Sequence, residues 1–205
     1  MKFLAARSDV DGQRTGVMGK SKGGEAALLI ASAYPQVRVV VVGVPSSVAW
    51  QGIDAKDRPN TAGSWSQAGK AVPFVPYDMS RPIISISDLY ARSLAGADAH
   101  PSAVIAVERI KGPVMRVCGE ADTLWPSCEM SDAVASRLRG RGFKDDVKVL
   151  HYANAGHAAF GLPIPDGNPA KAMLLALGGD AEGNNAARVE SWGEAMAFLD
   201  RTLKP

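Results

Sequence analysis

The sequence predicts an α/β fold with a mostly parallel sheet and helices on both faces of that sheet. Strand-like and helical segments alternate along the chain, and residues 37–44, VRVVVVGV, form a continuous apolar, largely β-branched run. Such a run is typical of a parallel strand that is covered on both faces. The 205 residues are enough for a single domain, 1–205, with a full hydrophobic core.

The composition is that of an ordinary globular protein, with 46% hydrophobic and 21% charged residues and a net charge of +2. This balance gives no reason to expect a nucleic-acid or a membrane partner. The apolar stretch at 3–6 is too short for a signal peptide, and no apolar run approaches the roughly 18 residues of a membrane span. Cys118 and Cys128 are too few for a disulfide framework, so we expect free thiols and a cytoplasmic location.

The elements are expected in the order strand, helix, strand, irregular excursion, strand, helix, strand, loop and helix. The helix GEAALLIASAY is apolar nearly all round, which is typical of a buried helix. The excursion is rich in proline and is expected to contain short helices, one of them at 86–95. Ser127 is the expected N-cap of the helix that follows it. The predicted ranges are helix 2–7, turn 9–13, strand 15–18, helix 24–34, strand 37–44, excursion 45–105 with helix 86–95, strand 112–119, helix 127–140, strand 146–152, helix 169–177 and helix 186–203.

The stretch GKSKGGE lies between a predicted strand and a predicted helix. Its pattern, Gly19-x-Ser21-x-Gly23, is that of a nucleophile elbow, in which small neighbours let the helix cross the strand closely. The helix N-terminus would direct its partial positive charge at the site, and the backbone N–H of Lys22 would donate to an oxyanion. The motif alone is weak, because Ser21 could equally be a helix cap.

A catalytic serine needs a base, and the base needs an acid that fixes its tautomer. His157 lies in the loop NAGHAAF directly after a strand, where sites of α/β folds collect. Asp122 follows another strand in CGEADTLWP, with Glu120 as its competitor. The order Ser21, Asp122, His157 is that of an α/β-hydrolase, which favours catalysis over the cap interpretation.

The other two histidines fit this site less well: His151 lies within a predicted strand, and His100 precedes a proline in the excursion. Lys20 and Lys22 flank the serine and could attract an anionic substrate, although such lysines are more often solvated or paired. Glu25 is explained by the helix dipole alone.

The aromatic residues of the excursion have two interpretations. They could form a lid over an acyl chain, or they could anchor the loop to the body of the protein. They are Trp50, Trp65, Phe74 and Tyr77. No spacing of His, Cys and Asp residues resembles a metal site.

Three segments, GVMGKSKGGEAALLIASAYPQV, IKGPVMRVCGEADTLWPSCEMSDAVASRLRGRGF and YANAGHAAFGLP, resemble a known family. It is the C-terminal domain of acyl-CoA thioester hydrolases and bile-acid-CoA:amino acid N-acyltransferases, near the dienelactone hydrolases. The resemblance implies Ser21 as nucleophile, Asp122 as acid and His157 as base, with an acyl thioester or ester as substrate and no cofactor. Some acyltransferases of this family carry cysteine at the nucleophile position, so serine favours hydrolysis over amino acid N-acyltransfer.

Only 18 residues precede Gly19, whereas the α/β-hydrolase pattern has several strands before the elbow. We therefore expect an N-terminally truncated sheet, either because the chain is a fragment or because a partner completes the sheet edge. An exposed edge favours association, so a homo-oligomer is one expectation. The missing loop would also carry the second oxyanion donor, worth about 3 kcal/mol of catalysis. A weakly active or inactive domain that serves in binding is the alternative function.

Overall fold

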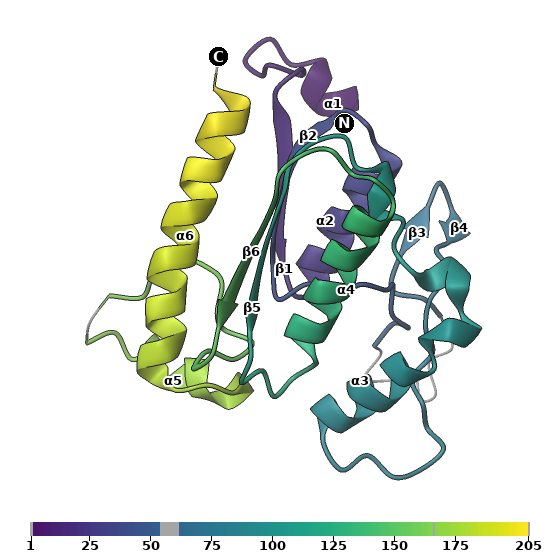
Figure 1. The fold of residues 1–205 in the computed structure, drawn as a ribbon, viewed down its shortest axis with the longest axis vertical. Coiled ribbons are helices and arrows are strands. Elements are labelled where there is room, and N and C mark those ends of the chain that lie inside the picture. Colours follow the sequence, from purple (N-terminus) through teal and green to yellow (C-terminus); the bar gives the residue numbers. More distant parts are fainter. Residues whose placement is uncertain (1, 54–61, 166, 205) are drawn as a thin grey trace.

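The main sheet consists of four parallel strands in the order β1-β2-β5-β6 (Figure 1). The computed structural model describes residues 2–53, 62–165 and 167–204. The strands of the sheet are β1 Thr15–Lys20, β2 Val37–Gly43, β5 Val114–Gly119 and β6 Val147–Tyr152. The predicted α/β architecture is confirmed, and its carboxyl strand ends all lie at one edge of the sheet.

Helices cover both faces of the sheet, so the fold has three layers. Helices α2 (Lys22–Ala33) and α4 (Ser127–Gly140) lie on one face, and α6 (Ala181–Leu203) lies on the other (Figure 1). The shorter elements are α1 Lys2–Ala5, β3 Ser66–Gln67, β4 Lys70–Ala71, α3 Ile86–Ala95, η1 Ala97–Ala99, η2 Pro101–Ala103, η3 Val107–Arg109, α5 Ala170–Met173 and η4 Leu174–Leu177.

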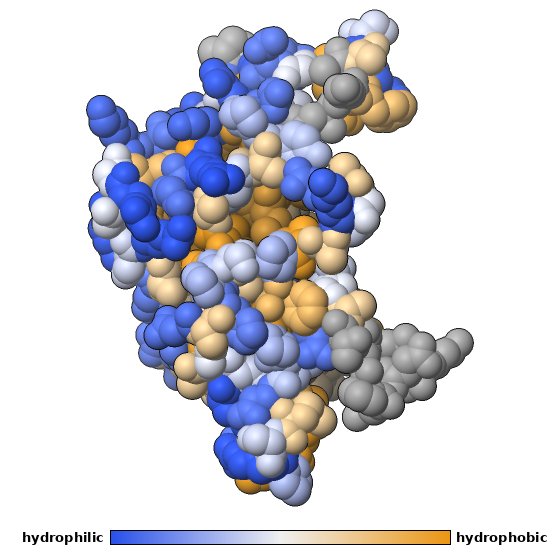
Figure 2. Space-filling view, turned by 90° about the vertical axis from the view of Figure 1, so that its right-hand side faces the viewer, coloured by the Kyte–Doolittle hydropathy of each residue, from blue (hydrophilic) through white to orange (hydrophobic). Residues whose placement is uncertain are grey.

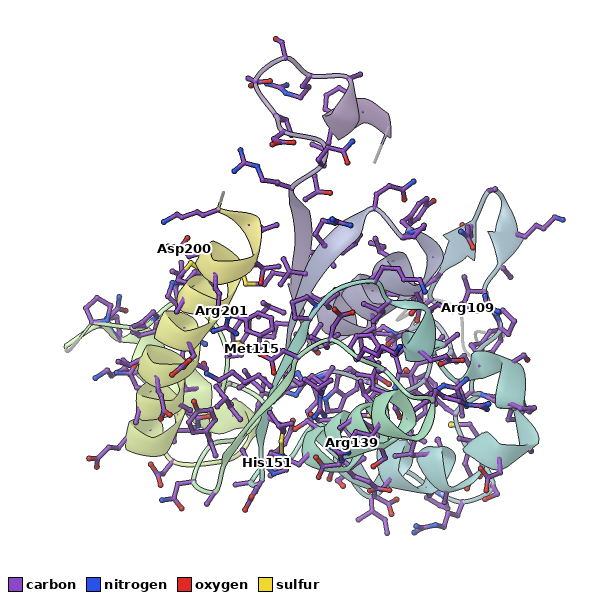
Figure 3. All side chains as sticks on the ribbon, turned by 45° about the horizontal axis from the view of Figure 1, so that its top comes forward. Arg109, Met115, Arg139, His151, Asp200 and Arg201 are labelled. Atoms are coloured by element: carbon purple, nitrogen blue, oxygen red, sulfur yellow. A yellow bond between two sulfur atoms is a disulfide. The ribbon has the colours of Figure 1, made fainter. Side chains whose placement is uncertain are left out.

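Strand β2 is the centre of the core, as its apolar run predicts. Every residue of β2 except Arg38 is buried. Alternate side chains of a strand point to opposite faces, so β2 contributes to two separate apolar clusters. Val40 and Val42 pack on the α2 and α4 side, and Val39 and Val41 pack on the α6 side together with Met115 (Figure 3).

The excursion between β2 and β5 packs beside α2 and α4 and contains the predicted helix 86–95 as α3. Its residues 54–61 lie outside the described part of the chain. Trp50 is fully buried, and its ring packs at right angles to the ring of Tyr90, which in turn packs edge-on to Trp125. Trp50 also stacks on Tyr77. These contacts support the anchoring interpretation of Trp50 and Tyr77.

Three local predictions are wrong. Ser127 is not the N-cap of α4: Pro126 has that position, and Ser127 donates its hydroxyl to the Gly119 carbonyl, 3.3 Å away. Helix α6 begins at Ala181 rather than at 186, because Asp180 caps it by accepting a hydrogen bond from the Gly183 amide. Helix α2 is not buried all round, since Ile30 is 39% exposed.

Helix α6 packs Ala187, Ala195 and Phe198 against the sheet, and the partly buried Trp192, Met196 and Leu199 pack against the same cluster. Val189 lies off this face and is 55% exposed. Within the described residues, no helix combines the length and the apolar character that a membrane crossing requires.

Cys118 and Cys128 form a disulfide, so the prediction of two free thiols is wrong. Cys118 lies near the end of β5 and Cys128 in the first turn of α4, and this strand-to-helix connection brings their Cα atoms within 5.1 Å. The separation suits a disulfide. The bond closes a short loop that contains Asp122.

Candidate active site

Ser21 occupies the turn between β1 and α2 with a backbone that few residues other than glycine adopt. Its φ is 55° and its ψ is −126°. Its amide donates to the Gly43 carbonyl at the end of β2, 2.9 Å away. The hydroxyl makes no capping hydrogen bond to α2. A strained residue of this kind, whose side chain is not used for capping, is typical of a functional turn.

The neighbouring glycines differ in their roles. A Cβ on Gly19 would lie 2.0 Å from the Gly23 carbonyl oxygen, and one on Gly24 would lie 3.3 Å from the Gly43 oxygen. A Cβ on Gly23 would meet nothing within 4 Å. The close crossing of strand and helix therefore requires Gly19. At Gly23, by contrast, no contact requires a small residue, although the motif predicts one there.

His157 bridges the serine and the acid. Its Nε2 lies 2.8 Å from Ser21 Oγ, and its Nδ1 lies 2.9 Å from Asp122 Oδ2. Both the His157 and Asp122 side chains are almost entirely buried, with exposed fractions of 4% and 2%. The structure thus brings together the three side chains that the sequence singled out, from three separate strand ends.

Asp122 is fixed by its own turn as well as by the histidine. Its second carboxylate oxygen, Oδ1, accepts hydrogen bonds from the amides of Leu124 at 2.8 Å and Trp125 at 3.2 Å. The Trp125 ring packs edge-on to the His157 ring, with centroids 5.4 Å apart. The carboxylate is therefore compensated in its buried position, and the imidazole is held on two sides.

A segment that sequence reasoning missed supports both loops. The Leu177 carbonyl accepts hydrogen bonds from the amides of His157 and Thr123, at 3.0 and 3.3 Å. Gly178 follows it with φ of 89°, and a Cβ there would lie 2.0 Å from the Ala121 oxygen. The glycine pair Gly178-Gly179 was the available signal, since paired glycines mark positions of positive φ or close approach.

Glu25 does more than complement the helix dipole. Although it is fully buried, its Oε1 accepts hydrogen bonds from the Trp50 amide at 3.0 Å and from Trp65 Nε1 at 2.6 Å. Its Oε2 pairs with Lys22 Nζ at 2.6 Å, and this ammonium also lies over the Trp65 ring. Burial raises the pKa of Glu25 and lowers that of Lys22. The cluster fastens the excursion to the helix that follows Ser21.

The remaining candidates lie away from the serine or are otherwise engaged. Exposed His151, on the edge strand β6, lies 3.1 Å from Asp132 and 3.6 Å from Glu120 (Figure 3). Its ring also lies near the sulfurs of Cys118 and Cys128, but these are joined to each other. Lys20 has no hydrogen-bonding or ion-pair partner among the described residues, unlike Lys22.

An apolar hollow of about 460 Å³ lies on the outer side of α2. Figure 2 shows hollowed apolar surface on the side of the molecule that carries the excursion between β2 and β5. Trp65 lines the hollow and also contacts Glu25, whereas no triad residue lines it. Its walls come from α2, the β3–β4 hairpin and the η2–η3 region, including Leu29, Ile30, Val72, Val104 and Arg109.

The family model described as "BAAT / Acyl-CoA thioester hydrolase C terminal" matches residues 1–205, the whole chain. This chain belongs to that family. Human mitochondrial acyl-coenzyme A thioesterase 2 is 26% identical to this chain over 216 residues. The match covers 99% of this chain but only 41% of the human protein. The chain thus spans less than half the length of that relative.

Solved structures agree with the fold of this family member. The acylaminoacyl peptidase of Pyrococcus horikoshii superposes with a TM-score of 0.58 at 14% identity, over 99% of this chain and 26% of the peptidase. A dienelactone hydrolase-like promiscuous phosphotriesterase from metagenomic libraries gives a TM-score of 0.52 at 18% identity, over 98% and 57%. The domain therefore has the α/β-hydrolase fold, and its structural neighbours include a dienelactone hydrolase-like protein.

Proposed function

We propose that the protein is a serine hydrolase that cleaves an acyl thioester or ester through an acyl-enzyme on Ser21. The carrying observation is the unbroken chain of hydrogen bonds from Ser21 through His157 to Asp122, at 2.8 and 2.9 Å. This arrangement has the nucleophile, base and orienting acid that acyl transfer needs.

In the first step, Ser21 Oγ attacks the acyl carbon as its proton moves to Nε2 of His157. Asp122 accepts a hydrogen bond from Nδ1–H and so holds the tautomer in which Nε2 carries the lone pair. The carbon–sulfur or carbon–oxygen bond then breaks, and the leaving group takes the proton from His157. The acyl group remains on Ser21.

In the second step, water gives a proton to His157 and attacks the acyl carbon, which releases the acid and returns the proton to Ser21. The Lys22 amide is the proposed oxyanion donor in both steps. It is the first residue of α2, so its N–H has no acceptor one turn earlier in the helix. The partial positive charge of the helix N-terminus favours the same oxyanion.

The thioester class is supported by the family and by the name of the human relative, an acyl-coenzyme A thioesterase. The chain covers 41% of that relative, so the activity is assigned here on the site itself. The acceptor of the acyl group is a separate question, because the family name includes an acyltransferase. Adding glycine or taurine to the reaction and measuring the amide product distinguishes transfer from hydrolysis.

Thiol release from a series of acyl-CoA thioesters tests the proposal. Ser21→Ala is expected to abolish turnover. Ser136→Ala is the matched control, since Ser136 is exposed near the C-terminal end of α4, the end away from the site. Turnover that survives in Ser21→Ala, at the level of the control, would rule out the mechanism. An inactive wild-type protein would instead favour the alternative of a binding domain.

We also propose a location for the protein and a mode of association. One is a cytoplasmic location, although the disulfide removes one of its supports. The other is association through β1, which within the described residues pairs only with β2. Size-exclusion chromatography tests the second, because a strictly monomeric protein at micromolar concentration would exclude it.

A further inference from the structure

Lys20 is a partly buried cation immediately before Ser21, and its ammonium is not neutralised. No hydrogen bond or ion pair joins its side chain to another described residue. The nearby Lys22 provides the contrast, since its ammonium pairs with Glu25 at 2.6 Å. A lysine that is partly buried without a partner bears a desolvation penalty, so its position next to the nucleophile calls for an explanation.

The register of the sheet fixes the side to which Lys20 points. Lys20 is paired with Gly43 of β2, and such neighbours in a parallel sheet share a face. A Cβ on Gly43 would touch the Phe160 side chain at 2.3 Å, so this is the face covered by the loop after His157. Gly16, two pleats before Lys20 on β1, lies against Leu203 of α6 on the same face.

Arg188 of α6 reaches the same loop. Its Nε donates to the Leu162 carbonyl at 2.8 Å, and its Nη1 donates to the carbonyls of Ala158 and Phe160 at 3.3 and 3.4 Å. Nη2 has no such acceptor among the described residues. It lies against Gly161, where a Cβ would come within 2.8 Å of it. The guanidinium therefore has one nitrogen with donors to spare.

The positive charge of Arg188 acts on the Lys20 ammonium. Burial lowers the pKa of Lys20, and the Arg188 charge lowers it further, while Asp122 acts in the opposite direction. The Asp122 carboxylate forms no ion pair with either cation, and its hydrogen bonds go to His157, Leu124 and Trp125. Two like charges beside Ser21, neither with an ion-pair partner among the described residues, form a natural site for an anionic group.

We propose that Lys20 and Nη2 of Arg188 bind an anionic group of the substrate, a carboxylate or a phosphate, near the acyl carbon. The inference rests on the proposed function and narrows its substrate class to anionic acyl esters and thioesters. The anion is either a carboxylate at the far end of the acyl chain or a phosphate of the leaving group. Both would accept hydrogen bonds from the ammonium and the guanidinium.

Four substrates separate these sources. One pair shares a neutral ethanethiol leaving group and compares a six-carbon acyl chain that ends in a carboxylate with one that ends in a methyl group. The other pair shares the neutral acyl chain and compares CoA with pantetheine, which lacks the phosphates. Each is measured with the wild type, with Lys20→Met and with Lys20→Arg, and Lys111→Met controls for the loss of one positive charge at the opposite end of the sheet.

Lys20→Met is expected to raise KM about tenfold for the anionic member of one pair, with less than a twofold change for its neutral counterpart. Lys20→Arg should restore most of the loss, and Lys111→Met should change neither. An effect confined to the carboxylate pair shows that Lys20 binds the carboxylate of the acyl chain. An effect confined to the CoA pair shows that it binds a phosphate of the leaving group. Equal changes in all four substrates, or no change in any, would overturn the proposal.

The test does not depend on turnover. In the Ser21→Ala background, equilibrium binding of the same four compounds can be measured by titration calorimetry, with the same pattern expected. If the wild type hydrolyses none of them but Lys20→Met still weakens binding of the anionic member, the proposed hydrolysis fails and the anion site stands. If the wild type hydrolyses the substrates but Lys20→Met does not distinguish the anionic from the neutral ones, the hydrolysis stands and the anion site fails.

Discussion

His157 Nε2 lies 2.8 Å from Ser21 Oγ, although 136 positions separate the two residues in the sequence. The contact forms because β1 and β6 are parallel and end at the same edge of the sheet, and because the loop after β6 crosses back over the end of β2, where Phe160 lies against Gly43. A hydroxyl, an imidazole and a carboxylate from three strand ends thereby form one continuous line of hydrogen bonds.

The choice of acid can be tested by amide substitution. Asp122→Asn keeps an oxygen that can accept from the Leu124 and Trp125 amides but no longer stabilises the imidazolium, so kcat should fall by about 10³–10⁴-fold. Glu120→Gln is the control, because Glu120 is exposed and contacts only His151 among the candidate residues. Steady-state kinetics in which the two variants lose activity equally would refute the assignment.

The elbow glycines give a matched pair for stability. Gly19→Ala places a Cβ 2.0 Å from backbone and should lower the free energy of unfolding by roughly 2 kcal/mol or more. Gly23→Ala places a methyl group in open space on a helix and should be neutral or raise stability by up to about 1 kcal/mol. Urea denaturation measures both. A destabilisation of similar size at the two positions would contradict the geometry of the turn.

Glu25 predicts a specific pH dependence of stability. Its pKa is raised in the folded protein, chiefly by burial, so the folded state binds a proton more readily than the unfolded state above pH 4.5. This contribution is fully present below the unfolded pKa and is lost as pH rises through the folded pKa. Compared with Glu25→Gln, the wild type should therefore gain stability as pH is lowered from 7 toward 4.5.

Denaturation of both proteins at pH 7, 6 and 5 measures this difference directly, and the shared titrations of other groups cancel. Glu25→Gln retains an oxygen for the Trp50 amide and Trp65 Nε1. A difference that stays constant over this range, or that shrinks as pH falls, would show that burial does not dominate at Glu25.

The disulfide should contribute to stability through the unfolded chain. Cys118 and Cys128 are ten positions apart, and closing a loop of this size is worth about 3 kcal/mol in the chain-entropy model. Reductant should therefore lower the free energy of unfolding of the wild type by roughly that amount and leave a Cys118→Ala/Cys128→Ala variant unchanged. Two reactive thiols in unreduced, denatured wild-type protein would contradict the bond.

The candidate site could be predicted from the sequence because its residues follow strands. Ser21, Asp122 and His157 each come directly after a segment with strong β character, and parallel strands bring such positions to one edge. Helix α3 and helix α4 have their predicted ends for a similar reason, since proline, serine and glycine around them are local signals.

The features that were missed depend on partners far away in the sequence. Glu25 looked like an ordinary first-turn carboxylate, and only the fold brings Trp65, 40 positions later, to its side. The disulfide depends on how a strand meets a helix, which spacing alone does not define. Ser127 looked like a cap, but it is the first residue inside α4, and its hydroxyl donates to the Gly119 carbonyl at the end of β5.

The most direct test of the central claim is the site of covalent modification by a fluorophosphonate, which reacts with activated serines. Intact-protein mass spectrometry should show one adduct per chain, and peptide mapping should place it on Ser21, with loss of labelling in both Ser21→Ala and His157→Ala. Labelling that persists in Ser21→Ala, or wild-type protein that remains unmodified under conditions that label a known serine hydrolase, would contradict a nucleophilic Ser21.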